Sequence, residues 1–105
     1  MIIFKTREAT DGIRLHFRPT KEYLTVQELE KQAKRDGKFS LGFHFILRKN
    51  GEVEKGINID MLADPVLEGA ATSVYVLVET AQLNDAQQHA LKKLTHTLNL
   101  SIVGG

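Results

Sequence analysis

The chain has 105 residues, of which 42% are hydrophobic and 26% are charged, a balance typical of a single globular domain. Its 14 basic and 13 acidic side chains nearly cancel, so no strong overall charge attracts it to nucleic acid or to a membrane surface. It has no cysteine, which excludes disulfide bonds, thiolate metal ligands and thiol nucleophiles. No apolar segment approaches the roughly 20 residues of a membrane span, and the charged amino terminus lacks the apolar core of a signal sequence. We therefore expect one cytoplasmic domain over residues 1–105.

The amino-terminal half combines a strand pattern with a helix pattern. Apolar residues recur at every second position over residues 13–17, which predicts a strand with one apolar and one polar face, ended by Pro19. Thr25 and Glu28 form a possible capping box at the start of a helix of about three turns, and Gly37 offers its carboxyl-terminal cap.

Residues 42–57 predict a β-hairpin, with strands at 42–49 and 52–57. Asn50 and Gly51 form the expected turn, because a two-residue type I′ turn requires positive φ at both positions and these residue types tolerate it best. Alternation in the first strand places one set of side chains on one face and a second set on the other. The first set is Phe43, Phe45 and Leu47, and the second is His44, Ile46 and Arg48.

The carboxyl-terminal half predicts a strand, a helix and a last short strand. The run SVYVLVE at 73–79 is rich in β-branched residues and indicates a buried strand, more typical of the centre of a sheet than of its edge. Asn84 can cap a helix whose leucines at 91, 94 and 98 form an apolar stripe. Residues 100–103 favour a final strand. The predicted fold class is therefore α/β, with a single mixed β-sheet flanked by helices.

The four histidines differ in their surroundings. His89 and His96 lie seven residues apart on the polar face of the second helix, which indicates a solvated surface. The spacing around His44 favours a hydrogen-bonded, partly buried histidine over a metal ligand. His16 lies between two arginines on the polar face of its strand, and this pattern fits a neutral metal ligand and a chance surface position equally well.

Four stretches, taken in order, resemble a known family. They are FKTREATDGIRLHF at 4–17, TVQELEKQAKRDG at 25–37, LGFHFILRKNGEVEKG at 41–56 and the AQQHALKKL helix near 86–94. Together they resemble the zinc-dependent N-acetylmuramoyl-L-alanine amidases of type 2, in particular the amidase lysozymes of the T-odd phages. The resemblance implies the same succession of strand, helix, hairpin, central strand and helix.

The resemblance also shows where this chain departs from the family's active site. A hydrolytic zinc needs about three protein ligands and an open position. His16 occupies the family's first ligand position, but the second histidine, the third ligand and a catalytic lysine belong to a segment that would follow IVGG. Phe43 replaces the catalytic tyrosine of the family motif G-Y-H-F, and NIDMLADPVLEGAATS replaces the family's substrate loop. We therefore expect an amidase scaffold without its zinc, in which His44 keeps a structural role.

The resemblance implies a protein partner, because phage lysozymes of this type also bind and inhibit their own phage RNA polymerase. The first hypothesis is a catalytically inactive amidase-like protein that acts by binding another protein. Its expected binding surface is bordered by Lys5, Arg7, Glu8 and Asp11, which lie in a charged segment that catalysis does not require.

Two other hypotheses remain open. One is a peptidoglycan amidase or cell-wall binder, in which His16 and His44 or a second subunit complete a metal site. The other is a nucleic-acid-associated module, although the nearly neutral net charge and the lack of interleaved aromatic residues count against it. Its basic patch would comprise Arg14, Arg18, Lys21, Arg48 and Lys49.

Overall fold

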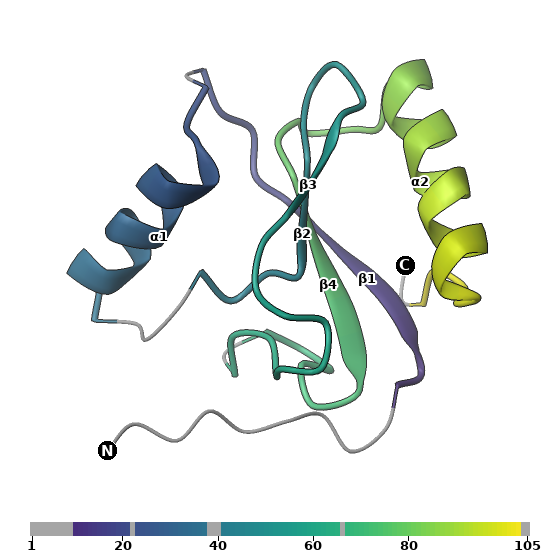
Figure 1. Cartoon of the computed structure of the whole chain (residues 1–105). Helices are drawn as coiled ribbons and strands as arrows, with labels where there is room; N and C mark the ends of the chain where they lie inside the picture. Colours follow the sequence, from purple (N-terminus) through teal and green to yellow (C-terminus); the bar gives the residue numbers. More distant parts are fainter. Residues whose placement is uncertain (1–9, 22, 38–40, 66, 104–105) are drawn as a thin grey trace.

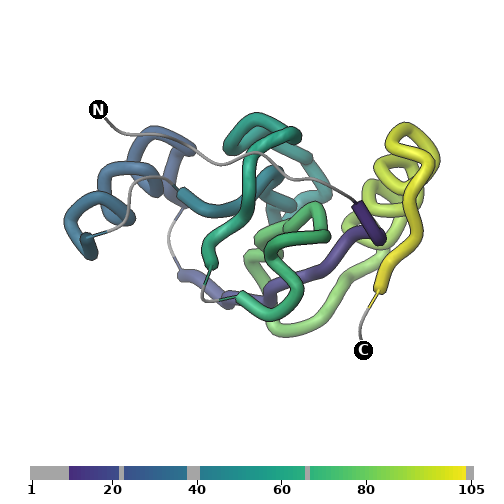
Figure 2. The backbone as a smooth tube through the Cα atoms, turned by 90° about the horizontal axis from the view of Figure 1, so that it is seen from below, coloured from purple at the N-terminus to yellow at the C-terminus, as the bar shows by residue number. Residues whose placement is uncertain are grey.

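The computed structural model describes residues 10–21, 23–37, 41–65 and 67–103, which form a mixed sheet between two helices (Figure 1). The elements in chain order are β1 (Gly12–Phe17), α1 (Val26–Arg35), β2 (Phe45–Leu47), β3 (Val53–Lys55), β4 (Ser73–Val78) and α2 (Asp85–Leu98). The helices α1 and α2 lie on opposite sides of the sheet in both backbone views (Figures 1 and 2). The α/β class and the mixed sheet flanked by helices are thus confirmed.

The strand β4 is the centre of the sheet. The strand order is β1-β4-β2-β3, with β4 parallel to both β1 and β2, and β3 antiparallel to β2. Every residue of β4 is buried. A strand covered on both faces needs apolar residues at consecutive positions, which explains why SVYVLV lacks the alternation seen in β1.

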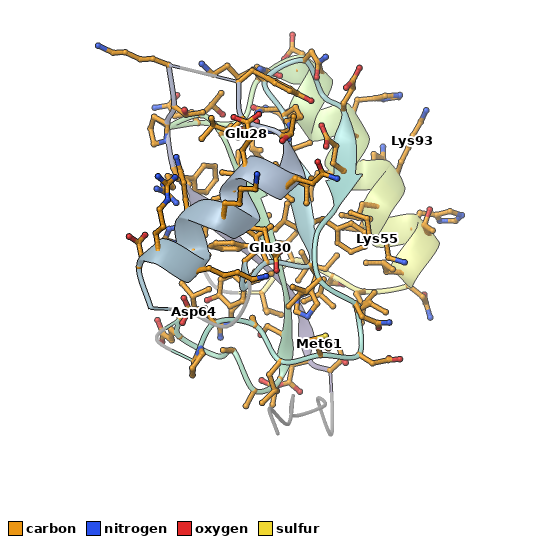
Figure 3. All side chains as sticks on the ribbon, turned by 60° about the vertical axis from the view of Figure 1, so that its left-hand side comes forward. Glu28, Glu30, Lys55, Met61, Asp64 and Lys93 are labelled. Carbon is orange, nitrogen blue, oxygen red and sulfur yellow. The ribbon has the colours of Figure 1, made fainter. Side chains whose placement is uncertain are left out.

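Each face of the sheet has its own apolar core. On the α1 side the core includes Leu29, Phe43, Ile46, Tyr75 and Leu77, together with residues of the segment between β3 and β4. The core on the α2 side is formed by Ile13, Leu47, Val74, Val76, Val78 and Leu91, with Leu94 and Leu98 packed against it. The predicted leucine stripe of α2 therefore faces the sheet. On the other helix, α1, Figure 3 shows the acidic residues Glu28 and Glu30. Neither described helix has the length and apolar character of a membrane span.

Both helices begin at the predicted caps. Thr25 Oγ1 accepts a hydrogen bond from the backbone N–H of Glu28 (3.1 Å), and Asn84 Oδ1 accepts one from that of Gln87 (2.9 Å). In each case the third helical residue returns a bond to the cap, which completes a capping box and satisfies backbone donors that the helix leaves unpaired. Gly37 follows the end of α1 with a φ of 86°, as expected for a carboxyl-terminal cap.

The hairpin turn differs from the predicted type I′ turn. Gly51 has a φ of 90°, but Asn50 is not among the residues with positive φ. The Arg48 N–H donates to the Glu52 carbonyl (2.8 Å), so the loop contains three residues, and the Asn50 side chain accepts from the Glu52 N–H (3.0 Å). A three-residue loop needs only its last residue in the left-handed region. The strands β2 and β3 are correspondingly shorter than predicted.

The predicted alternation is wrong at Phe43. Gly42 has a φ of 83°, and regular pairing of β2 begins only at Phe45, so Phe43 packs in the α1-side core with Ile46 instead of facing α2 with Phe45. A single left-handed residue reorients the chain before the strand and shifts the side-chain alternation.

His44 is a buried bridge between backbone segments. The backbone N–H of His44 donates to the Tyr75 carbonyl (2.9 Å), and the ring Nδ1 of His44 accepts from the Tyr75 backbone N–H (2.9 Å). Since Nδ1 is an acceptor, Nε2 carries the proton and donates to the Met61 carbonyl (2.6 Å). The prediction of a hydrogen-bonded histidine is confirmed, and its side chain is completely buried where partial burial was expected.

The last predicted strand is reduced to one bridge. Ile102 pairs with Ile13 in parallel, through bonds from the Ile13 N–H to the Ser101 carbonyl (2.8 Å) and from the Val103 N–H to the Ile13 carbonyl (2.8 Å). This segment therefore extends the sheet beside β1 without forming a strand.

We predict that His44→Ala lowers the free energy of unfolding by about 2–4 kcal/mol, because it leaves the buried Tyr75 N–H and Met61 carbonyl without their side-chain partner. The exposed His96 provides a matched control, and His96→Ala should change stability by less than about 0.5 kcal/mol. Urea unfolding at neutral pH measures both values. Equal effects of the two substitutions would contradict the structural role of His44.

Candidate functional site

The sheet brings together the two positions that the resemblance singles out. His16 of β1 is half-buried on the α1 side of the sheet, and its ring centroid lies 5.4 Å from that of the buried Phe43. Phe43 contacts Tyr75 edge-on, with 6.3 Å between centroids. Alternation along β1 turns Ile13 and Leu15 toward α2 and leaves His16 on the opposite face. His16, Phe43 and Tyr75 thus form a continuous aromatic cluster, here called the His16 cluster.

The His16 cluster offers no free hydroxyl group to a substrate. Phe43 has no group that could donate a hydrogen bond to a substrate carbonyl. The Tyr75 hydroxyl donates to the Glu68 carbonyl, and burial raises the pKa of Tyr75 above its usual value. The neutral Tyr75 hydroxyl is therefore engaged with the backbone, and the side of His16 that meets Phe43 is apolar.

The described residues do not fit a hydrolytic zinc by themselves. Within residues 10–21, 23–37, 41–65 and 67–103, no three His, Cys, Asp or Glu side chains gather closely enough to hold a metal ion. His44 cannot readily assist His16, because both of its ring nitrogens bind backbone groups. A catalytic zinc requires about three protein ligands. The loss of zinc itself stays a prediction.

The predicted binding surface lies largely outside the described part of the chain. Lys5, Arg7 and Glu8 belong to residues 1–9. Asp11 is exposed just before β1, and its backbone N–H donates to the Thr72 carbonyl (2.6 Å). The assignment of these four residues to a surface for a protein partner therefore stays a prediction.

A polar cluster, separate from the aromatic rings, centres on Arg48, directly after β2. Arg48 is only 2% exposed, and its Nε lies 2.8 Å from Oε1 of Glu54 on β3. Its Nη1 lies 2.9 Å from Oε1 of the buried Glu79, which directly follows β4. The ring of Tyr23 covers the guanidinium, with its centroid 4.3 Å from Cζ, and its hydroxyl donates to Glu54 Oε1 (2.8 Å).

These contacts set the charges of the cluster. Burial alone would lower the pKa of Arg48, but the bonds to Glu54 and Glu79 outweigh burial and raise it, so the guanidinium stays charged. The hydrogen bonds from Arg48 and Tyr23 lower the pKa of the Glu54 carboxyl. The bond to Glu54 in turn raises the pKa of the Tyr23 hydroxyl.

The start of α2 fixes the backbone beneath this cluster. The buried Gln87 donates through Nε2 to the Arg48 carbonyl (3.2 Å), and Asn84 donates through Nδ2 to the Lys49 carbonyl (2.8 Å). The capping residues of α2 thus also hold the end of β2.

The Arg48 cluster was not predicted from the sequence, and it argues against the basic patch. Arg48 was grouped there with Arg14, but the structure buries Arg48 in ion pairs and binds Arg14 Nε to Ser73 Oγ (3.2 Å). The available signal was a charged residue at an inward-facing position at the end of each of two apolar strands, Arg48 and Glu79. Such a residue is seldom buried unless it is paired.

Comparison with known proteins identifies the family. The chain is 30% identical to the endolysin of Klebsiella phage KP32 over 112 residues, covering 96% of this chain and 74% of that protein. It is 40% identical to the endolysin of Escherichia phage T7 over 55 residues, covering 50% of this chain and 36% of that protein. This chain belongs to the amidase family of T7-like phage endolysins. No protein-family model matches the sequence.

Solved structures support the same fold. The amidase LysC from Clostridium intestinale superimposes with a TM-score of 0.73 at 16% identity, covering 96% of this chain and 77% of LysC. The peptidoglycan recognition protein PGRP-Hd from Alvinella pompejana gives a TM-score of 0.75 at 17% identity, covering 99% of this chain and 76% of that protein. This endolysin-family chain therefore has the amidase and peptidoglycan-recognition fold.

We predict that the ion pairs of Glu54 make stability depend on pH in the acid range. The folded-state pKa of Glu54 is depressed, so its contribution is present above its unfolded pKa and is lost as pH falls through the folded pKa. Glu54→Gln should cost about 1 kcal/mol at pH 7 and reduce the loss of stability below about pH 4.5.

The exposed Glu52, on the same hairpin, supplies the control for this prediction. Glu52→Gln should change the free energy of unfolding at pH 7 by less than about 0.5 kcal/mol. An equal loss of unfolding free energy at acid pH in the wild type and in Glu54→Gln would contradict the assigned role of Glu54.

Proposed function

We propose that this protein is a non-catalytic member of the endolysin family that acts by binding another protein. The observation that carries the proposal is the contact between His16 and Phe43, in which a phenyl ring stands where the resemblance implies a catalytic tyrosine. Amide hydrolysis depends on groups that stabilise the developing oxyanion. A ring without a donor, against the half-buried His16, removes one such group while keeping the packing.

The proposed partner is a phage RNA polymerase, which the family resemblance implies, and the proposed site of action is the cytoplasm. Lys5, Arg7, Glu8 and Asp11 are the proposed border of the surface. Charged residues at the border of an interface mainly raise the association rate and set specificity. In this proposal the protein partner is bound beside a scaffold that no longer hydrolyses amides.

Recognition of peptidoglycan is the second candidate function. The fold neighbours include a mutant of Drosophila PGRP-LB in complex with tracheal cytotoxin, and the ectodomain complex of PGRP-LCa and PGRP-LCx bound to the same molecule. This favours a cell-wall ligand for the present chain as an alternative to a protein partner. The half-buried His16 would then contact such a ligand.

We predict that the purified chain, supplied with zinc, releases no free amino groups from peptidoglycan above the buffer level. Phe43→Tyr alone should not restore activity, since a hydroxyl does not replace the activated water of a zinc enzyme. The endolysin of Klebsiella phage KP32 is the positive control for the assay. Turnover by this chain that His16→Ala abolishes would refute the non-catalytic assignment.

We predict that the chain binds the RNA polymerase of a T7-like phage, and that Lys5→Glu/Arg7→Glu weakens binding about tenfold, mainly through a slower association rate. Biolayer interferometry measures both rate constants. The control is Lys92→Glu/Lys93→Glu, which changes the same charge on the exposed face of α2 and should leave binding unchanged. Undetectable binding of the wild type, or equal losses in the two variants, would contradict the proposal.

A further inference from the structure

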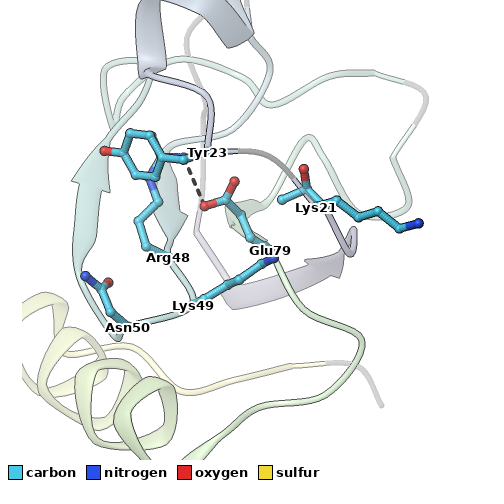
Figure 4. A pocket seen from close by; sticks show the side chains of 7 residues that line it. Lys21, Tyr23, Arg48, Lys49, Asn50 and Glu79 are labelled. Carbon is cyan, nitrogen blue, oxygen red and sulfur yellow. Dashed lines mark hydrogen bonds and ion pairs between the residues drawn. The ribbon is translucent and has the colours of Figure 1, made fainter.

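A cavity of about 320 Å³ opens beside the Arg48 cluster (Figure 4). Its lining residues are Thr20, Lys21, Tyr23, Arg48, Lys49, Asn50 and Glu79. Figure 4 shows the Tyr23 ring beside Arg48, Lys49 running toward Glu79, and Lys21 extending outward on the far side. The volume is within the range of small-molecule sites.

The topology of the sheet places this cavity where α/β proteins bind ligands. Arg48 directly follows β2, Glu79 directly follows β4, and Thr20 comes three residues after the end of β1. These three strands are parallel to one another. The carboxyl ends of parallel strands in an open sheet form the crevice in which ligands usually bind.

Arg48, which lines this cavity, has a hydrogen-bond donor that the described residues leave unused. Its Nε and Nη1 bind Glu54 and Glu79, but the buried Nη2 has no hydrogen-bond partner among the described residues. A buried polar group without a partner costs free energy, and a charged one costs more. An acceptor oxygen supplied by a ligand would remove that cost.

The charged side chains that line the cavity favour an anionic ligand. Among the described residues, Arg48, Lys21 and Lys49 bring positive charge to the cavity, and Glu54 and Glu79 are already bound to Arg48. Lys21 and Lys49 at the cavity therefore attract a small anion. A phosphate dianion would meet stronger repulsion from the two carboxylates.

Tyr23 is the movable side of the cavity. It is 65% exposed, and it is held over Arg48 by the ring contact and by one hydrogen bond to Glu54. Because an exposed side chain changes rotamer rapidly, rotation of Tyr23 can uncover the guanidinium without unfolding the core.

We propose that this cavity binds a small carboxylate, whose oxygen accepts a hydrogen bond from Arg48 Nη2 while Lys49 and Lys21 lie at the rim. Charge-assisted bonds between guanidinium and carboxylate are among the stronger hydrogen bonds in proteins. The site is separate from the His16 cluster and does not depend on the proposed protein partner.

The test is an NMR titration of the full chain, following backbone amides and the Arg48 side-chain resonances. The probes are N-acetylglycine, its uncharged methyl amide, and inorganic phosphate. N-acetylglycine should give saturable shifts at residues 20, 21, 23, 48–50 and 79, whereas the methyl amide should give none. Absence of saturation, equal effects of the methyl amide, or tighter binding of phosphate would overturn the proposal.

Surface variants make the test independent of folding defects that substitution of Arg48 itself could cause. Lys21→Ala/Lys49→Ala should weaken N-acetylglycine binding roughly fivefold or more, the effect of about one unscreened surface charge interaction. Lys92→Ala/Lys93→Ala on α2 removes the same charge away from the cavity and should leave the affinity unchanged. Equal losses in both variants would indicate a non-specific charge effect and overturn the site.

Discussion

The burial of β4 between β1 and β2 is the constraint on which the rest of the structure depends. Two parallel neighbours and a core on each face bury every residue of this strand. Because β1 and β2 run parallel, α1 connects them by crossing one face of the sheet, and the segment between β3 and β4 packs on that same face. The polar groups of that face are consequently buried, and they need partners within the protein.

His44 and Arg48 meet this requirement at the two ends of β2. His44 takes a place in the hydrogen-bond ladder at Tyr75 and also binds the crossing segment at Met61. Arg48 joins β2 to β3 through Glu54 and to β4 through Glu79. His44 satisfies neutral backbone groups, and Arg48 pairs with charged groups. His44 is therefore part of the scaffold.

Local patterns allowed much of the fold to be predicted. The Thr25 and Asn84 caps, the stripe of α2 and the central strand depend on residues close in sequence, and all four are confirmed. The predicted turn type at Gly51 and the predicted direction of the Phe43 side chain were wrong. Each depends on which single residue adopts a positive φ, and more than one neighbouring residue could do so. A strand pattern does not encode such an angle.

The aromatic site was predicted from the sequence, but the Arg48 cluster was not. Family resemblance located His16 and Phe43, and the sheet brings their rings into contact. The Arg48 cluster escaped prediction because Arg48 and Glu79 are 31 residues apart, and Tyr23 joins them from a third segment. Charged residues at the ends of apolar strands are also common at surfaces, so composition alone does not distinguish a buried pair from a solvated one.

Stability alone is a weak reason for the Arg48 cluster. Buried ion pairs lose solvation free energy, and replacing all partners by apolar residues of similar size is often neutral or stabilising by roughly 1–4 kcal/mol. The cluster also leaves one guanidinium nitrogen without a partner among the described residues. An apolar cluster would close the ends of β2 and β4 at least as well, but it would remove the positive charge from the crevice of the parallel strands. The arrangement therefore makes better physical sense as a polar site held ready by the scaffold than as a means of holding the sheet together.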